Sequence, residues 1–425
     1  MRKSILLTLN VLVLAACLPL PFIQRSSGLI AYVGTDANIY VTDQSGKNPI
    51  ALTEDASIPE EQSGAFRFYQ YPTWSPESNL LAFVGIRGEG GIQSVSDLYV
   101  ADIDSEASER IYTSEIEHPF YLYWSPDNEN LGFLSTTPSG QTFVLQSIPV
   151  QGGDRTILDT GSPYYWSWAP DGKTMIIHTG GANTTTVQHM AFLQVGSQII
   201  EDGLEADPGA FQAPAWSPDG SQILFSRVND ENEKEVILAD GSGSVDKALG
   251  TVEVSTSFAW SRDSELVAYI AGDRSLTAGS VGALHVLDLT TSEDFFQDED
   301  VFAFFWSPNS RKLAYFKPRL SNSGAAGAAS DAQQQVLLLQ LHMLDVISGE
   351  SRELFTFQPT NQFASILPYF DQYHQSTTIW SPDSNNLVLS FLDSENTPGI
   401  AVVAASGQLE PRLVANGYLA FWSWK

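Results

Sequence analysis

Cysteine is almost absent from this chain, because its 425 residues include only Cys17. A single cysteine cannot form an internal disulfide and cannot supply the thiolate cluster of a structural zinc site. Basic residues are also few: 21 Lys and Arg stand against 50 Asp and Glu, which gives a formal net charge of −29. A surface this acidic repels phosphate backbones, so we do not expect nucleic acid as a partner.

The short motifs of common catalytic and nucleotide-binding sites are also missing. The sequence has no Gly-x-Ser-x-Gly elbow, no Walker loop, no dinucleotide fingerprint and no His-Glu-x-x-His. His178 and His189 have no carboxylate at ligand spacing. We therefore expect no cofactor and no metal site. These absences favour binding over catalysis, although they do not decide whether the protein is an enzyme.

Long apolar runs are limited to the N-terminus. A positive start at Arg2 and Lys3 is followed by the nearly unbroken apolar run 5–16, which is the order of an export signal. The run is shorter than the ~20 residues that span a bilayer. Leu14-Ala-Ala-Cys17 resembles the bacterial lipobox, in which cleavage leaves a lipid-modified cysteine. We expect a signal peptide (1–17), a lipid on Cys17 and a linker (18–27). The mature chain would then be anchored to the cell membrane or outer envelope, facing outside the cytoplasm; the alternatives are a secreted protein and an uncleaved anchor helix.

A tryptophan-centred repeat fills the remainder, residues 28–425. Each copy has a short apolar run ending in tryptophan, and Ser-Pro-Asp or a close variant follows. Proline, Asp, Asn and Gly are the residues that tight turns favour. Successive tryptophans are 42 to 50 residues apart, except for one interval of 74; they are Trp74, Trp124, Trp168, Trp216, Trp260, Trp306, Trp380 and Trp422.

Each repeat contains four short strand-like runs, which is typical of a propeller blade. The third run often ends in an aspartate that we expect to cap its own turn: Asp43, Asp102, Asp240, Asp288 and Asp345. We predict an all-β chain forming a single propeller of eight four-stranded blades. The first unit lacks a tryptophan strand and 418–424 is one with nothing after it, so the C-terminal strand is expected to close the ring by joining blade one. Seven blades are the alternative, with the unit around Trp168 the weakest.

These repeats resemble those of the TolB-like propellers, a WD-repeat-like family with the same Trp-Ser-Pro-Asp-Gly turn. The resemblance covers the mature chain and implies the fold, but it implies little about function. TolB itself has an α/β domain before its propeller, whereas a short linker precedes the first blade here. Its partner-binding role is therefore not transferred to particular residues.

Long connections are expected on one face of the ring. The first-to-second-strand turns are tight and share one side, so the other connections open on the opposite side, where binding usually occurs. The longest are 85–96, 317–335, 55–67 and 358–376, and the insertions 317–335 and 358–376 explain the long interval. Segment 361–374 is too apolar for a free loop, so we expect it to fold over the ring as a lid or to dock a partner.

Two sets of residues are candidates for binding on that face. Where three inner strands begin, aromatic side chains accompany an arginine and a histidine: Arg67, Phe68, Tyr69, Tyr71, His118, Phe120, Tyr121, Tyr164 and Tyr165. They either grip a peptide or glycan, or pack between blades and plug the channel. Cations follow several second strands: Arg87, Arg227, Arg274, Lys317 and Arg319. They either form a basic ring or pair with carboxylates of neighbouring blades.

The sequence thus favours an envelope-bound binding or scaffold protein that presents its long-loop face to a protein or peptide. We expect a monomer that meets the membrane only through the lipid on Cys17. The rival hypothesis is an enzyme or saccharide-binding propeller, lyase-like or hydrolase-like, that works in its central funnel. It predicts titratable groups at the funnel mouth, near His118 and Arg67.

Overall fold

The computed structural model describes residues 28–58, 64–90, 94–137, 139–180, 188–196, 198–204, 206–209, 212–276, 279–322 and 335–425. The expected signal peptide, the lipid site at Cys17 and the linker 18–27 lie outside the described residues. Most of the expected insertion 317–335 also lies outside them.

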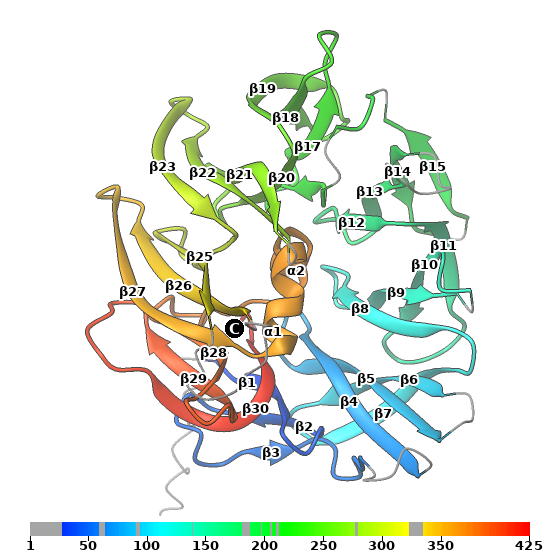
Figure 1. Cartoon of the computed structure of the whole chain (residues 1–425). Coiled ribbons are helices and arrows are strands. Elements are labelled where there is room, and N and C mark those ends of the chain that lie inside the picture. The colour runs from blue at the N-terminus through cyan, green and yellow to red at the C-terminus, as the bar shows by residue number, and fades with distance from the viewer. Residues whose placement is uncertain are drawn as a thin grey trace, which may run out of the picture.

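Antiparallel four-stranded sheets arranged around a common centre make up most of the protein (Figure 1). Five sheets are separate: β4 (Ala65–Trp74), β5 (Leu80–Glu89), β6 (Val95–Asp102) and β7 (Ala107–Ser114); β8 (His118–Trp124), β9 (Asn130–Thr136), β10 (Phe143–Pro149) and β11 (Thr156–Gly161); β12 (Tyr164–Trp168), β13 (Thr174–Thr179), β14 (His189–Gln194) and β15 (Ile200–Gly203); β16 (Ala215–Trp216), β17 (Gln222–Val228), β18 (Lys234–Asp240) and β19 (Val245–Val252); β20 (Ser255–Trp260), β21 (Leu266–Leu276), β22 (Gly279–Asp288) and β23 (Glu293–Val301). The unit around Trp168, the weakest in the sequence, therefore forms a complete sheet, β12–β15.

The remaining strands join into one ten-stranded sheet. Its order is β24 (Ala303–Trp306), β25 (Lys312–Asn322), β26 (Gln335–Asp345), β27 (Glu350–Pro359), β28 (Asn386–Leu392), β29 (Pro398–Ala404), β30 (Arg412–Trp422), β1 (Ile30–Gly34), β2 (Ile39–Thr42) and β3 (Ile50–Ala51). The first part of β30 pairs with β29 and its last part pairs with β1, so Ile30 lies opposite Trp422. The predicted pairing of the C-terminal strand with the first unit is thus present.

The turn chemistry expected from the sequence is confirmed. The five aspartates that end third strands each accept backbone N–H groups of the turn that follows, as Asp102 does from Asp104 and Ser105. Burial acts to raise the pKa of each of the five carboxyls, and at Asp43 it is the largest single cause, but the hydrogen bonds together lower the pKa of all five. In the tight turns after the tryptophans, a serine hydroxyl donates to the Asp two residues on, as Ser125 does to Asp127 at 2.5 Å.

The buried tryptophans link each sheet to the one before it. The indole N–H donates to the carbonyl of the residue preceding the tryptophan of the previous sheet: Trp74 to Phe421 (3.2 Å), Trp124 to Thr73 (2.9 Å), Trp260 to Ala215 (3.0 Å), Trp306 to Ala259 (3.2 Å) and Trp380 to Phe305 (2.9 Å). This indole ladder gives a physical reason for a tryptophan at each inner strand. It is interrupted at Trp168 and Trp216, whose indole nitrogens have no hydrogen-bond partner among the described residues.

The interruption allows a matched test of the ladder. Trp124 and Trp168 are 2% and 3% exposed, and Trp→Phe removes the same atoms from each. Trp124→Phe leaves the buried carbonyl of Thr73 without its donor, a loss that costs about 1–3 kcal/mol. We expect this variant to lose that much more free energy of unfolding than Trp168→Phe, measured by urea denaturation. Equal losses in the two variants would contradict the proposed role of the ladder.

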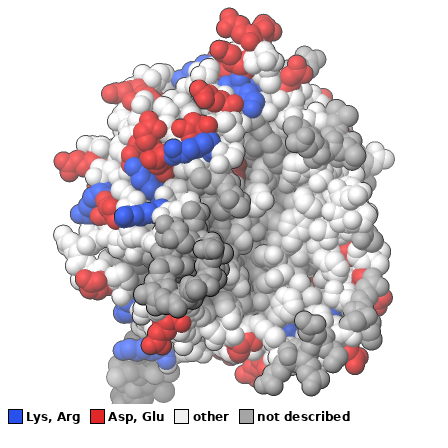
Figure 2. Space-filling view, viewed as in Figure 1, with Lys and Arg blue, Asp and Glu red and all other residues white. Residues whose placement is uncertain are grey.

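Charged side chains gather on one side of the ring. In the view of Figure 2 they lie over β17–β27, while the side over β8–β15 is mostly uncharged. Two connections predicted to be long are partly strand, because β5 continues to Glu89 before β6 begins at Val95, and β25 continues to Asn322. Ion pairs stabilise these extensions: Arg87 on β5 pairs with Asp97 on β6, and Lys317 on β25 pairs with Asp298 on β23.

A helical segment occupies the centre of the ring (Figure 1). It comprises α1 (Asn361–Ile366), the 3-10 turn η1 (Leu367–Tyr369) and α2 (Phe370–Ser376). It interrupts an inner strand: Gln358 and Pro359 pair with the end of β28, and Trp380 bridges to Leu387 at its start. Between these two points the chain leaves the sheet and α2 packs against β8, β12, β20 and β24. We call α1, η1 and α2 the plug; it lies inside the ring rather than over it.

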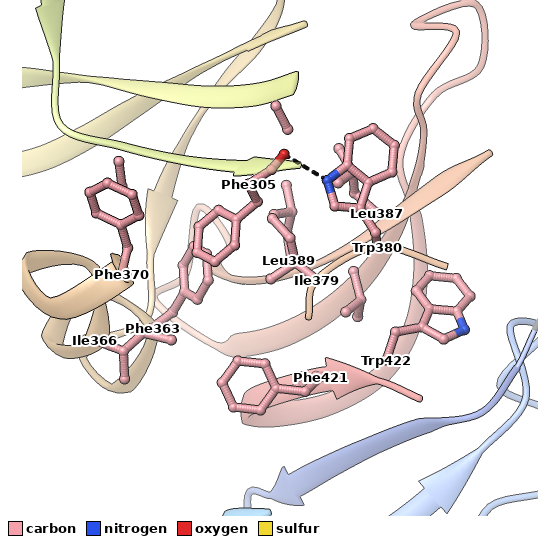
Figure 3. Packing of buried hydrophobic residues seen from close by; sticks show 14 of the residues in the cluster. Phe305, Phe363, Ile366, Phe370, Ile379, Trp380, Leu387, Leu389, Phe421 and Trp422 are labelled. Carbon is pink, nitrogen blue, oxygen red and sulfur yellow. Dashed lines mark hydrogen bonds between the residues drawn. The ribbon is translucent and has the colours of Figure 1, made fainter. Parts of the chain in front are cut away.

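The plug is held by apolar packing and by its own polar groups. Phe363, Ile366 and Phe370 are buried beside Phe305 and the inner strands, as Figure 3 shows. The ring of Phe370 lies 4.8 Å from that of Phe304, centroid to centroid. The Thr360 side chain caps α1 by accepting from the Phe363 N–H at 3.2 Å. These contacts fill the centre, so the inner strands do not border an open channel at this level.

Candidate functional site

Three of the candidate tyrosines are part of the packed interior. Tyr69, Tyr121 and Tyr164 are 4%, 4% and 2% exposed. The Tyr121 hydroxyl donates to the Gln372 carbonyl of the plug at 2.8 Å, and the Tyr164 hydroxyl donates to Asp159 at 2.8 Å. Burial raises the pKa of both phenols well above its usual value. Of the two interpretations left open by the sequence, packing describes these three residues: Tyr121 packs on the plug residue Tyr373, and Tyr69 packs on Phe83 and Tyr99 of its own sheet.

The other candidate aromatics are half-buried and lie around the plug. Phe120 packs on Phe143 with ring centroids 5.0 Å apart. Tyr165 meets the plug residue Tyr369 edge-on at 6.4 Å, and Tyr369 remains 49% exposed. Tyr71 lies in a β-bulge of β4 with φ of 57°, a left-handed conformation that is costly for a bulky residue. Because of the bulge, Tyr71 does not follow the alternation of side chains between the two faces of the strand that the sequence implied.

The cations of the predicted basic ring nearly all have carboxylate partners. Three pair within their own sheet, as Arg87–Asp97 (2.8 Å), Arg227–Glu235 (3.3 Å) and Arg274–Asp300. Lys317 pairs with Asp298 of the neighbouring sheet at 2.6 Å. Arg319 is exposed and has no carboxylate within 4 Å in the described part of the chain. The ring is therefore an array of neutralised pairs, mostly within sheets rather than between them.

Arg67 and His118 each have a separate partner and do not contact one another. Asp55 binds the guanidinium of Arg67 and accepts from the hydroxyl of Tyr69 at 2.6 Å. His118 Nδ1 shares a hydrogen bond of 2.7 Å with Ser96 Oγ. Over the residues that the structure describes, no group of three or more His, Cys, Asp or Glu side chains could hold a metal ion.

A groove of about 910 Å³ lies beside the plug, between α1, β4 and the chain ends. The wall from β4 carries Phe66, Phe68 and Tyr71, all half-buried, and the opposite wall includes Gln362 and Ile366 of α1. The groove combines aromatic rings with polar groups, as peptide-binding grooves do. Sequence reasoning identified Tyr69 and Tyr71 here but did not assign α1 to the site. The apolar composition of 361–374 was the available signal.

Comparison with known proteins agrees with this architecture. The family model "TolB beta propeller domain" matches residues 35–264, just over half of the chain. An uncharacterized protein of Agrobacterium fabrum is 27% identical over 203 residues, which are 44% of this chain, and the match spans only 61% of that relative. Among solved structures, the C-terminal WD40 domain of Sif2 covers 88% of this chain and 92% of its own at a TM-score of 0.52 and 12% identity.

A prolyl endopeptidase structure also matches 82% of this chain and 49% of its own, at a TM-score of 0.51 and 12% identity. At these identities, both structural matches bear on the fold and not on the activity. No helix in the described ranges is long and apolar enough to cross a membrane.

Proposed function

The chain belongs to the TolB β-propeller family, and on that basis we propose that it is an envelope protein whose long-loop face binds a protein or peptide. The proposed ring has eight blades, one for each tryptophan strand, with the pairing of β30 and β1 as its closure. A closed ring leaves no open sheet edge for unwanted pairing. It provides a rigid support for the loops of one face.

The observation that carries the proposal is the groove beside the plug. Phe66, Phe68 and Tyr71 are only half-buried, whereas many other aromatic side chains of the propeller are fully buried. The strained backbone of Tyr71 keeps its ring beside the groove. Partly exposed aromatic rings around a groove are typical anchors for a peptide or a protein loop.

The start of the described chain supports an orientation for the molecule. Gly28 has φ of 67°, and a side chain there would meet Ser423 Oγ at 2.6 Å and Pro382 at 2.7 Å. Pro382 belongs to a tight turn, and Ser423 follows Trp422 at the position that the turn serines have in the other copies, so the chain enters on the tight-turn face. A linker of the ten residues 18–27 reaches at most about 35 Å when extended. With the lipid on Cys17, the tight-turn face would be turned to the membrane and the long-loop face would point outward.

Site-specific cross-linking in intact cells tests this arrangement. A photoreactive amino acid replaces exposed Gln362, beside the groove, or exposed Lys173, in a tight turn on the other face. We expect an adduct with one envelope protein or peptide from position 362 and not from 173. The adduct should fall at least tenfold when Phe68→Ala removes an aromatic wall, because an interface anchor contributes about 2 kcal/mol or more.

Two controls accompany that experiment. Ile347→Ala, at an apolar side chain that is 76% exposed away from the groove, should leave the adduct unchanged. Cys17→Ser should move the chain from the membrane fraction to the soluble fraction. An adduct that survives Phe68→Ala, or that forms only from position 173, overturns the binding face. Retention of the Cys17 variant in the membrane overturns the lipid anchor.

A further inference from the structure

On the tight-turn face, two adjoining cavities of about 380 and 240 Å³ open toward the centre of the ring. They share the lining residues Tyr123, Pro126, Arg262 and Gln375. The other walls are aromatic rings and the prolines of the tight turns, and the floor is the end of α2. We call these two cavities the turn-face funnel. It lies at the opposite end of the plug from the groove.

The funnel brings together two departures from the repeat. The second residue after the repeat tryptophan is proline in six copies: Pro76, Pro126, Pro170, Pro218, Pro308 and Pro382. The two exceptions are Arg262 and Trp424. Their side chains meet, because the guanidinium carbon of Arg262 lies 4.4 Å from the centroid of the Trp424 ring. The two copies that lack the proline thus place side chains that contact each other. Two departures from the repeat at contacting positions indicate that these residues serve a purpose other than forming the fold.

Arg262 has no charge partner. Its side chain is exposed in the funnel, and none of the described carboxylates lies within 4 Å of it. The nearby cation Lys425 is paired with Glu77 at 2.7 Å. Arg262 thus differs from Arg87, Arg227 and Arg274, whose guanidinium groups each pair with a carboxylate.

Two buried polar atoms near the arginine also lack partners. His374 is 8% exposed, lines the smaller cavity and has no hydrogen-bond partner for Nδ1 within the described ranges. Gln375 lines both cavities, and its Oε1 has no partner there either. Burial and the nearby Arg262 lower the pKa of His374 to about 3, so its imidazole is neutral. Arg262 is therefore the single unpaired cation in this part of the funnel.

We propose that the turn-face funnel binds a carboxylate attached to an apolar or aromatic group, with Arg262 as its anchor. A guanidinium binds a carboxylate through two parallel N–H···O bonds, and stacking on Trp424 holds its plane in place. Trp74, Trp124 and the turn prolines supply apolar walls for the rest of the ligand. One cation matches the single charge of a carboxylate better than the higher charge of a phosphate, because the net charge of −29 repels an anion more strongly as its charge increases.

Two sources can present this chemistry: the C-terminus of a peptide and a small free acid. The cavities suit a group of one or two residues, since ligand sites begin at about 300 Å³. The site does not depend on the long-loop groove, because the two lie at opposite ends of the plug. Variants of one should leave the other intact.

Titration calorimetry on the purified full chain in mild detergent tests the proposal. The probes are N-acetyl-phenylalanine, its uncharged amide, the peptide acetyl-Gly-Ala-Phe with a free carboxylate, and inorganic phosphate. We expect the two carboxylates to bind at least tenfold more tightly than the amide and the phosphate, because a charged hydrogen bond contributes about 1.5–3 kcal/mol. Tryptophan fluorescence provides a second readout, since Trp74, Trp124 and Trp424 line the larger cavity.

Matched variants identify the anchor. Arg262→Gln should weaken carboxylate binding at least tenfold, and Arg262→Lys should weaken it less. Arg311→Gln, at an exposed arginine of the next tight turn, should have no effect, nor should Phe68→Ala in the groove. Tighter binding of the peptide than of N-acetyl-phenylalanine supports a peptide C-terminus, and equal binding supports a small acid. Equal binding of acid and amide, preference for phosphate, or an unchanged Arg262→Gln variant overturns the proposal.

Discussion

Replacing Gln372 with alanine is expected to lower the free energy of unfolding by about 3–5 kcal/mol. Gln372 lies in the plug and is 3% exposed. Its side-chain amide makes the two hydrogen bonds to Trp166 that the backbone of a neighbouring strand would otherwise make. Oε1 accepts from the Trp166 N–H at 3.0 Å, and Nε2 donates to the Trp166 carbonyl at 2.8 Å and to the Tyr121 hydroxyl at 2.9 Å. The alanine variant leaves both backbone groups of an inner strand buried and unpaired.

Urea denaturation followed by tryptophan fluorescence measures this loss. Gln362→Ala is the matched control, because Gln362 lies on the same plug but is exposed, and we expect a change within about 0.5 kcal/mol. Gln372→Glu keeps the shape but cannot donate to the Trp166 carbonyl and buries a charge, so it should cost at least as much as alanine. A Gln372→Ala midpoint equal to that of Gln362→Ala would show that the plug does not support the inner strands.

The second large effect concerns Asp371, whose protonation should control stability near neutral pH. Asp371 is 2% exposed, and its oxygens accept from the Ala213 N–H at 2.9 Å and the Gln372 N–H at 3.0 Å. Burial raises the pKa of this carboxyl to about 7, although the backbone N–H groups act against the rise. A carboxyl with a raised pKa favours the fold while it is protonated. Its contribution is complete below the unfolded pKa of about 3.9 and is lost as the pH rises through 7.

Asp371→Asn removes this titration and keeps an oxygen for the Ala213 N–H. We expect the wild type to lose on the order of 2–4 kcal/mol relative to this variant between pH 5 and pH 8. The wild type is compared with the variant because two histidines also change the stability over part of that range. Burial lowers the pKa of His178 to about 4 and the pKa of His374 to about 3, so both increase the free energy of unfolding as the pH rises. Urea midpoints at the two pH values provide the measurement, and Asp246→Asn at an exposed site is the control. Parallel pH profiles of the wild type and Asp371→Asn would refute the prediction.

Acid should destabilise the protein through a different set of groups. Hydrogen bonds from the turns lower the pKa of Asp102, Asp288 and Asp345, so their stabilisation is present above the unfolded pKa and is lost as the pH falls through the folded values. Asp371 has the opposite sign. The two trends together place the greatest stability in mildly acidic solution.

The sheets could be predicted from the sequence because the residues that determine the strands and turns of a sheet lie within its own repeat. A tryptophan, a Ser-Pro-Asp turn and an aspartate at the end of the third strand act over a few residues, and they act the same way in each copy. The indole ladder explains why the tryptophan recurs, since its donor reaches a fixed carbonyl of the preceding sheet. Even the weak unit around Trp168 forms its sheet, although its indole lacks a partner.

The site was harder to predict because it depends on contacts between distant repeats. The alternation of Tyr164 and Tyr165 does not indicate that a helix from residue 370 onward fills the centre beside them. The apolar content of 361–374 indicated burial, but composition alone does not distinguish a segment over the ring from one within it. Tyr71 was a candidate, but the bulge that contains it and shifts the strand register escaped prediction. Arg262 was visible as an irregular copy, whereas its contact with Trp424 required coordinates.

The double role of β30 has a consequence for how the chain folds. Leu29 and Ser423, 394 residues apart, exchange hydrogen bonds where β1 meets β30. Open repeat arrays gain stability copy by copy from neighbours near in sequence. Here β29 and β1 both pair with the same late strand, and the loop that must close is nearly the whole chain, so the final step is slow. The ten-stranded sheet therefore stays incomplete until β30 has been made and docked.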